Sequence, residues 1–317
     1  MVSHNHLITR RGLIPAVFFC LALLGQASSW SHESVVFCSY NLKNWLLMQR
    51  SFDDKEAPPT SKPEKEKRKV IEFLKTIRPD ILGVCEIGKL EDLQDVQTRL
   101  RQQGIDLPYL EHNMGGDPTR SLGLLSRFPI TARDSQVKLE YHIGEDIFLM
   151  QRGILDATVT LSPQLQIRFL GVHLKSKRAI PEADEALMRR NEAHLLRRHL
   201  DSVFHKNPQE KIVCYGDFNE HRNEPAISEI IGSRSSPSYM IDLHLKDEHG
   251  LVWTHFWDDA DVYGRLDYLF VSRALRPLVE TKGTYIFSSA EFDQASDHRP
   301  IVMTLKPRPP VASQGQP

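Results

Sequence analysis

Short apolar runs alternate along the chain with longer segments in which apolar residues recur every three or four positions. The short runs predict buried strands, and the periodic segments predict helices that pack by one face. The expected strands cover residues 35–40, 81–85, 122–126, 147–150, 154–161, 167–172, 212–215, 265–271 and 301–305. The expected helices cover residues 64–77, 90–100 and 182–204. Because both kinds of element interleave without a linker, we expect one mixed α/β domain over residues 34–306.

The first 27 residues have the layout of a secretory signal peptide. Arg10 and Arg11 precede an apolar run over residues 13–24, and Gly25 and Ala27 supply small residues for a cleavage site. The run is shorter than the ~20 residues of a transmembrane helix, although a short membrane anchor is an alternative. We expect an exported, periplasmic or extracellular protein with no membrane insertion after processing. We expect the proline-rich tail, residues 307–317, to be disordered.

The charge balance limits the classes of function. Lys and Arg number 40 against 41 for Asp and Glu, so the chain lacks the strong positive charge of a protein that grips nucleic acid by bulk charge. Four cysteines are too few for a disulfide scaffold. Cys38, Cys85 and Cys214 precede polar strand-end residues by odd numbers of positions. We expect these thiols to be buried and to point away from those residues.

Polar residues follow or interrupt the apolar strands. They are Asn41, Glu86, His173, Asp217, Asn219, Asp267, Asp297 and His298. A charged residue inside a buried strand is costly unless it is paired or metal-bound, and strand ends of one sheet converge on a common rim. Carboxylate and amide oxygens with two imidazoles suit a hard cation with acid–base partners.

Each residue alone also has a structural interpretation. Asn41 could form a turn, Asp217 could form an Asx turn with Asn219, and Asp267 could pair with Arg265. His173 could be a satisfied core histidine. Their joint occurrence, each next to an apolar strand, favours a functional site.

Seven segments carry a more specific resemblance. They are Ser39-Tyr40-Asn41-Leu42, residues 79–86, residues 125–130, residues 172–176, Gly216-Asp217-Phe218-Asn219, Arg265-Leu266-Asp267-Tyr268 and residues 296–300. In this order the chain resembles the endonuclease/exonuclease/phosphatase superfamily, which includes pancreatic-type deoxyribonucleases, abasic-site exonucleases, neutral sphingomyelinases and inositol polyphosphate 5-phosphatases. The resemblance implies a four-layer α/β sandwich, with two mixed β-sheets packed face to face and helices outside.

The resemblance also implies roles for single residues. Glu86 would be the main Mg²⁺ ligand, with Asn41 and Asp297 shaping the metal and phosphate site. Asp217 would orient or deprotonate the attacking water, and Asn219 would hold the phosphate or that water.

Further residues would act on the phosphate. Asp267 would pair with His298 and keep the imidazolium against a phosphate oxygen, and His173 would lie near the phosphate. Arg152 is a weaker candidate for a phosphate contact. Lys175 and Lys177 form either a rim that attracts the substrate or a solvated surface. The sequence reveals no acidic partner for His173, for which Glu111 and Asp117 are only nearby candidates.

These features predict a monomeric, Mg²⁺-dependent hydrolase of phosphate esters, with Mn²⁺ or Ca²⁺ as alternative ions. The leading interpretation is a phosphodiesterase with nuclease activity, whose partner is a phosphate-ester substrate such as nucleic acid. The alternatives are a phosphatase or phospholipase-type esterase for sugar, inositol or lipid phosphates, and a non-catalytic binding protein. The aromatic segment 253–257 either stacks on a base or sugar or packs internally.

Overall fold

The structure is a computed structural model that describes residues 1, 2, 34–50 and 56–306. Nearly all of the predicted signal peptide and all of the predicted disordered tail lie outside these residues. The described residues from 34 onward belong to one compact unit. None of the helices in the described ranges is long and apolar enough to cross a membrane.

The first large sheet has six strands in the order β15-β16-β1-β2-β4-β3. Their bounds are Val279–Ile286, Ile301–Leu305, Val35–Trp45, Ile81–Ile87, Ser121–Ser126 and Tyr109–Asn113. β1 and β2 are parallel, and the other neighbours are antiparallel. The sheet is therefore mixed, and the regular pairing of its parallel strands is interrupted after Asn41 and Cys85, the residue before Glu86.

The second large sheet has the order β11-β14-β10-β9-β8-β5. Its strands span Met240–Asp242, Asp267–Ser272, Ile212–Asp217, Leu165–His173, Leu155–Ser162 and Ile130–Arg133. β9 and β10 are parallel, and the other neighbours are antiparallel. Two separate hairpins complete the strands, β6–β7 (Glu140–Ile143 and Asp146–Leu149) and β12–β13 (His255–Trp257 and Val262–Gly264).

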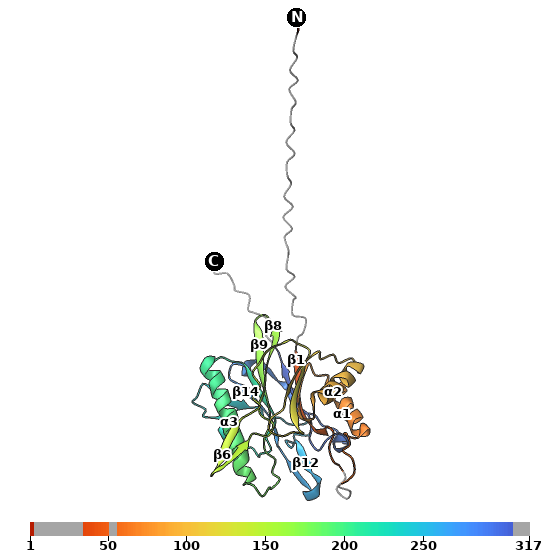
Figure 1. The fold of residues 1–317 in the computed structure, drawn as a ribbon, viewed down its shortest axis with the longest axis vertical. Coiled ribbons are helices and arrows are strands. Elements are labelled where there is room, and N and C mark those ends of the chain that lie inside the picture. The colour runs from red at the N-terminus through yellow and green to blue at the C-terminus, as the bar shows by residue number, and fades with distance from the viewer. Residues whose placement is uncertain (3–33, 51–55, 307–317) are drawn as a thin grey trace. The chain divides into compact units, whose positions relative to one another are not determined.

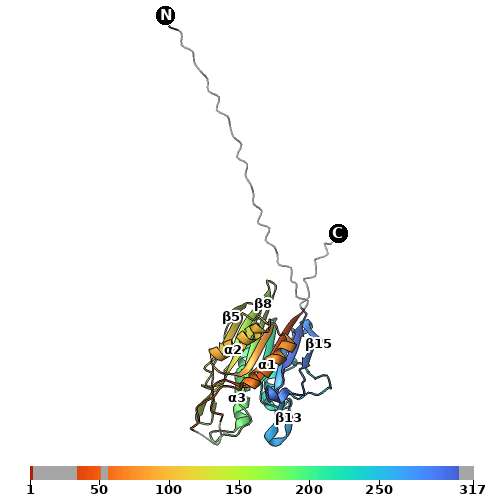
Figure 2. The same ribbon diagram turned by 90° about the vertical axis from the view of Figure 1, so that its right-hand side faces the viewer.

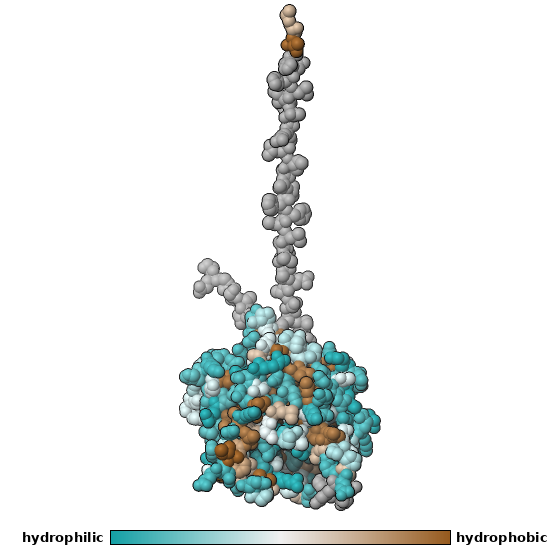
Figure 3. Space-filling view, in the orientation of Figure 1, coloured by the Kyte–Doolittle hydropathy of each residue, from teal (hydrophilic) through white to brown (hydrophobic). Residues whose placement is uncertain are grey.

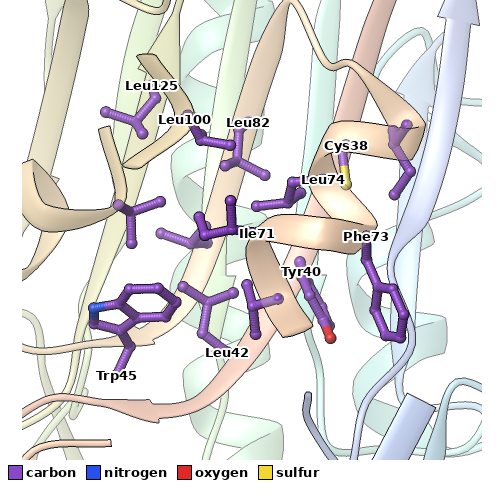
Figure 4. Close-up of a cluster of buried hydrophobic side chains, with 14 of the residues drawn as sticks. Cys38, Tyr40, Leu42, Trp45, Ile71, Phe73, Leu74, Leu82, Leu100 and Leu125 are labelled. Atoms are coloured by element: carbon purple, nitrogen blue, oxygen red, sulfur yellow. The ribbon is translucent and has the colours of Figure 1, made fainter. Parts of the chain in front are cut away.

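Helices cover the outer face of each sheet (Figures 1 and 2). α1 (Glu64–Ile77) and α2 (Leu90–Gln102) lie on the first sheet, and α3 (Glu185–Lys206) and α4 (Pro225–Ile231) lie on the second. Short 3-10 helices span Asp258–Ala260, Arg276–Leu278 and Phe292–Gln294. Figure 4 shows Ile71, Phe73 and Leu74 of α1 packed onto Tyr40 and Leu82 of the first sheet. The predicted four-layer sandwich is confirmed.

Aromatic rings fill the space between the two sheets. Tyr215 and Phe169 of the second sheet each have a ring centroid 5.0 Å from that of Phe37 in the first. A Cβ atom on Gly83 would lie 2.1 Å from the Tyr215 ring, and one on Gly171 would lie 2.7 Å from its hydroxyl oxygen. These glycines therefore allow the sheets to approach closely enough to align their polar strand ends.

The three described cysteines are free and buried, as expected. Cys38 and Cys214 lie in the clusters under the helices, on the faces away from Asn41 and Asp217. The expected direction of Cys85 is wrong, because its sulfur lies 3.4 Å from the Val172 carbonyl oxygen of the opposite sheet. Glu86 has a φ of 57°, which interrupts the strand alternation on which that expectation depended.

Candidate active site

The polar strand ends of both sheets meet at one edge of the sandwich. Asn41 ends the parallel section of β1, where it pairs with Cys85, the residue before Glu86. In the second sheet, Asp217 pairs with both His173 and Asp267. Strand pairing within each sheet therefore places these residues side by side, and the sandwich brings the two sets together.

Asn41 lies at the centre of this group. Its Nδ2 atom donates to Asp217 Oδ2 at 3.1 Å and to Glu86 Oε1 at 3.4 Å. The same atom lies 3.4 Å from His298 Nε2. One amide thus links a carboxylate of the first sheet with a carboxylate of the second.

His298 and Asp267 form a buried hydrogen-bonded pair. The Nδ1 atom of His298 donates to Asp267 Oδ2 at 2.8 Å, and its Nε2 atom lies 3.6 Å from Asp217 Oδ2. The Ser296 hydroxyl donates to the Asn41 carbonyl oxygen at 2.8 Å and accepts from the His298 amide at 3.1 Å. These bonds fix the loop that carries His298 against β1.

The carboxylate of Asp217 makes one hydrogen bond within its own turn and also faces residues that are distant in the sequence. The Asn219 amide donates to its Oδ1 atom at 2.9 Å, which is the Asx turn considered from the sequence. The other oxygen, Oδ2, faces Asn41, His173 and His298. The structural and functional interpretations of Asp217 therefore apply to different oxygens of the same carboxylate.

His173 faces the carboxylates of both sheets. Its Nε2 atom lies 3.5 Å from Asp217 Oδ2 and 4.0 Å from Glu86 Oε1. Its Nδ1 atom is buried without a hydrogen-bond partner among the described residues. Burial first, and then nearby Arg152, lowers the pKa of His173 well below its usual range. The lowered pKa favours the neutral ring, whose Nε2 atom faces the carboxylates of Asp217 and Glu86.

The two acidic candidates suggested for His173 contact other groups. Glu111 pairs with Arg133 at 2.7 Å, and Asp117 lies 3.8 Å from Arg152. The alternative ion pair between Asp267 and Arg265 is also wrong, because Arg265 pairs with Asp242 at 2.6 Å.

Arg152 lies beneath the site rather than at its surface. It is 3% exposed and donates to the carbonyl oxygens of His173 at 3.0 Å and Leu174 at 2.8 Å. These bonds hold the end of β9 in place.

The structure does not bring Lys175 to the group around Asn41. Its ammonium donates to the carbonyl oxygens of Ser176 at 3.1 Å and Arg178 at 2.9 Å. Lys177 pairs with Glu220 at 2.6 Å. Both lysines thus have local partners.

Arg120 was not identified from the sequence, and His255 was included there only as part of the aromatic segment 253–257. Arg120 donates to the side-chain oxygen of Asn44 at 2.8 Å, and the backbone N–H of Asn44 donates to Glu86 Oε2 at 2.9 Å. The ring centroid of His255 lies 4.6 Å from that of His298, and the two residues form a β-bridge. Neither residue follows a predicted strand, so strand-end reasoning could not find them.

Burial and charge shift the pKa values of the central residues. Burial raises the pKa of Asp217 to about 7. Burial opposes the charged form of His298, but Asp267 and Asp217 outweigh it and raise its pKa well above the usual range. Burial likewise opposes ionisation of Asp297, but His298 and Lys43 outweigh it and lower that pKa. The site therefore favours a charged His298 beside a charged Asp297.

Strained backbone is concentrated at the site. Among the described residues, six non-glycine residues have positive φ, and four of them belong to the site or its edge. Those four are Lys43 at 48°, Asn44 at 59°, Glu86 at 57° and Asn219 at 49°. Such conformations cost about 1–3 kcal/mol each and persist only where surrounding contacts enforce them.

The group could hold a metal ion. Three carboxylates, those of Asp217, Asp267 and Asp297, act on the imidazolium of His298, and a fourth, that of Glu86, is linked to Asp217 through Asn41. Ligand atoms of Asp217, Asp267 and His298 all lie within 4.8 Å of one another. The excess of negative charge and the oxygen-rich donor set both fit a hard divalent cation.

A second group of acidic residues differs from the first in its balance of positive and negative charge. Ligand atoms of Asp134, Asp156 and His199 also lie within 4.8 Å of one another. However, Arg168 pairs with Asp156 at 2.5 Å and with Asp134 at 3.0 Å. The guanidinium supplies the positive charge there, so this group is an ion-pair network.

Residues 46–298 match the sequence model of the Endonuclease/Exonuclease/phosphatase family, and the chain therefore belongs to this family. The resemblance inferred from the motifs is thus confirmed. A comparison with curated proteins found no match.

Solved structures share the fold at low sequence identity. One is beta toxin from Staphylococcus aureus, with TM-score 0.59 and 14% identity over 85% of this chain and 99% of that chain. Another is the human Nocturnin catalytic domain, with TM-score 0.58 and 15% identity over 86% and 94%. A third is sphingomyelinase C from Streptomyces griseocarneus, with TM-score 0.56 and 12% identity over 86% and 99%.

Proposed function

We propose that the protein is a divalent-metal-dependent hydrolase of phosphodiesters. The observation that carries this proposal is the convergence of Glu86, Asp217 and the Asp267–His298 pair on Asn41. Cleavage of a phosphodiester by water needs a group that accepts a proton from the water and cationic donors for the developing negative charge. This group of side chains contains both.

Each side chain has one task in the proposed reaction. Asp217 accepts the proton of the attacking water through Oδ2, and Asn219 orients that water or a phosphate oxygen. His298, held in its charged form by Asp267, donates from Nε2 to a phosphoryl oxygen. His173 donates from Nε2 toward the same space.

The metal supports these steps. Glu86 would hold it, with Asn41 and Asp297 completing the oxygen-rich site. A bound divalent cation supplies Lewis acidity that neutralises charge on the phosphoryl group.

The substrate class has two candidates. Nucleic acid is the candidate that the sequence favours, and single phosphoester molecules, such as sugar, inositol or lipid phosphates, are the second. The second is favoured by carboxylates at the exposed tips of both hairpins, Asp258, Asp259 and Asp261 on β12–β13 and Glu145 and Asp146 on β6–β7. A polyanionic strand that crossed either tip would be repelled.

The proposal is tested with a panel of substrates at fixed protein concentration. The panel contains bis(p-nitrophenyl) phosphate, plasmid DNA, single-stranded DNA, RNA, sphingomyelin and phosphorylated inositols, each with Mg²⁺, Mn²⁺, Ca²⁺ or excess chelator. Hydrolysis that chelator and Glu86→Gln abolish, and that Glu72→Gln on the exposed face of α1 leaves unchanged, supports the proposal. Full activity in chelator would defeat it.

We also propose that residues 1–27 direct export and that the mature protein is monomeric. The arginine pair and the short apolar run support the first proposal. N-terminal sequencing of periplasmic or secreted protein, followed by sedimentation analysis, tests both.

A further inference from the structure

A cavity of about 560 Å³ lies beside the candidate active site. Its apolar wall is formed by Pro118, Ile147, Phe148, Leu149 and Met188, and Arg120 lies in its lining as the cationic residue. The wall comes from three separate places in the fold, the loop before β4, the hairpin β6–β7 and the first turn of α3.

Hydrogen bonds through Arg120 link the lining of the cavity to the site. The Nε atom of Arg120 donates to the Asn44 side-chain oxygen at 2.8 Å, and the backbone N–H of Asn44 donates to the Glu86 carboxylate at 2.9 Å. The guanidinium lies 4.0 Å from the carboxylate of Asp117, which also lines the cavity, and the Arg120 side chain is 31% exposed, so its open part can meet an incoming anion. A phosphate near Glu86 would therefore have Arg120 on the side that faces the cavity.

Backbone contacts build the floor of the cavity. The Asp117 amide donates to the Gln151 carbonyl oxygen at 2.6 Å, which ties the loop before β4 to the segment after β7. A Cβ atom on Gly116 would lie 2.9 Å from the Cβ atom of Leu149. The loop and the hairpin are thus in close contact, and the glycine at this point allows their close approach.

The apolar wall continues onto the surface. Ile147 is 61% exposed, Leu149 is 43% exposed and Leu187, beside Met188, is 41% exposed. Figure 3 shows hydrophobic residues gathered at the lower left, over the hairpin β6–β7. Exposed apolar side chains that gather around a cavity mark a binding surface more often than scattered ones do.

The charges around this wall select against a polyanion. Glu145 and Asp146 form the exposed tip of the hairpin, and Asp184 is exposed at the start of α3. A nucleic acid strand would have to pass these carboxylates, whereas an uncharged hydrocarbon group would not be repelled.

We propose that this cavity binds the hydrocarbon chain of a single phosphoester molecule, with Arg120 contacting its phosphate. This inference rests on the proposed function, because it places the phosphate at the candidate active site. It assigns the cavity to substrate selection and the hairpin β6–β7 to the recognition of the chain.

The test is calorimetric titration with n-alkyl phosphates from methyl to octyl, below the concentration at which they aggregate. Excess chelator is present, so that metal-dependent hydrolysis does not accompany binding. Each methylene group that is fully buried would lower the dissociation constant about fourfold. In a cavity that is open on one side, each methylene is only half-buried and would lower it about twofold. We therefore expect octyl phosphate to bind about 100-fold more tightly than methyl phosphate.

Two kinds of variant separate the contribution of the ligand's hydrocarbon chain to binding from that of its phosphate. The double change Ile147→Ser and Leu149→Ser should remove most of the dependence on chain length and leave methyl phosphate binding unchanged. Arg120→Met should weaken all chain lengths by a similar factor, roughly tenfold, and Arg120→Lys should restore part of the loss. Leu251→Ser is the matched control, because Leu251 is 48% exposed and does not line the cavity.

Three results would overturn the inference. They are equal affinity for all chain lengths, a chain-length dependence that survives the double serine change, and methyl phosphate binding that Arg120→Met does not weaken. Since the titration needs no hydrolysis, these results are independent of the substrate panel. Loss of metal-dependent hydrolysis in that panel would instead contradict the proposed function.

Discussion

The imidazole of His298 donates from Nδ1 to Asp267 at 2.8 Å, and both side chains are buried. The bond fixes the ring so that its Nε2 atom faces Asn41 and Asp217. Asp267 therefore acts on the reaction through the orientation and charge of His298.

This relationship predicts an order among two variants. His298→Ala removes the cationic donor and should lower kcat about 10²–10³-fold. Asp267→Asn keeps the imidazole but holds it less well, so its loss should be smaller. Steady-state kinetics on bis(p-nitrophenyl) phosphate measures both. A larger loss for Asp267→Asn than for His298→Ala would contradict the assigned roles.

Metal binding should stabilise the native state. An ion that binds only the folded protein at 100 times its dissociation constant adds about 2.7 kcal/mol to the free energy of unfolding. We therefore expect Mn²⁺ or Mg²⁺ to raise the melting temperature of the parent protein, and Glu86→Gln to reduce that rise strongly. Differential scanning calorimetry with and without chelator measures the effect, and far-ultraviolet dichroism should remain nearly unchanged. An equal rise in Glu86→Gln would place the metal elsewhere.

His255 should make stability depend on pH. Burial, followed by the charge of His298, lowers the pKa of His255 to about 4 from its ordinary 6.5. Between these values the unfolded chain binds a proton that the native state does not, so stability is lost as the pH falls through this window. Because the ring is half-buried, solvent screening reduces the expected contribution to about 1–2 kcal/mol.

The variant His255→Gln should therefore lose less stability on acidification than the parent does, by this amount. His142→Gln is the control, since His142 is exposed on β6. Urea unfolding at pH 7 and pH 4.5 gives the comparison. Equal losses in the parent and in His255→Gln would show that folding does not shift the titration of His255.

Arg78 offers a test of the backbone far from the site. It is exposed, it follows α1, and its φ of 52° lies in the left-handed region. Glycine adopts this conformation without the steric cost of a Cβ atom, so Arg78→Gly should stabilise the protein by about 1 kcal/mol. Arg78→Ala should not, because alanine keeps the Cβ atom. Chemical denaturation distinguishes them, and a less stable glycine variant would contradict this helix ending.

Most of the fold could be predicted because local pattern and global packing agree. The helix expected over residues 64–77 has the bounds of α1, and the strand expected over residues 301–305 has the bounds of β16. The strand expected over residues 147–150 is present as β7, but β7 belongs to a separate hairpin and not to a large sheet. Pairing partners depend on the whole fold, which local periodicity does not encode.

The site could be predicted where residues follow strands, since strand ends of a sheet share an edge. Asn41, Glu86, His173 and Asp217 meet for this reason. Arg120 and the partners of His173 could not be predicted, because they depend on contacts between the two sheets and on loop conformation. The left-handed conformation of Glu86, which breaks the alternation of side chains after Cys85, also has no local signature.

The central claim is that Asp217 activates water for attack on a phosphodiester, and its most direct test is kcat for Asp217→Asn. The amide preserves the shape of the side chain, which is 1% exposed, but removes the group that accepts the proton. On bis(p-nitrophenyl) phosphate with saturating Mn²⁺, we expect kcat to fall about 10²–10⁴-fold, with a melting temperature close to that of the parent. A kcat near that of the parent, on a substrate whose hydrolysis chelator abolishes, would contradict the account.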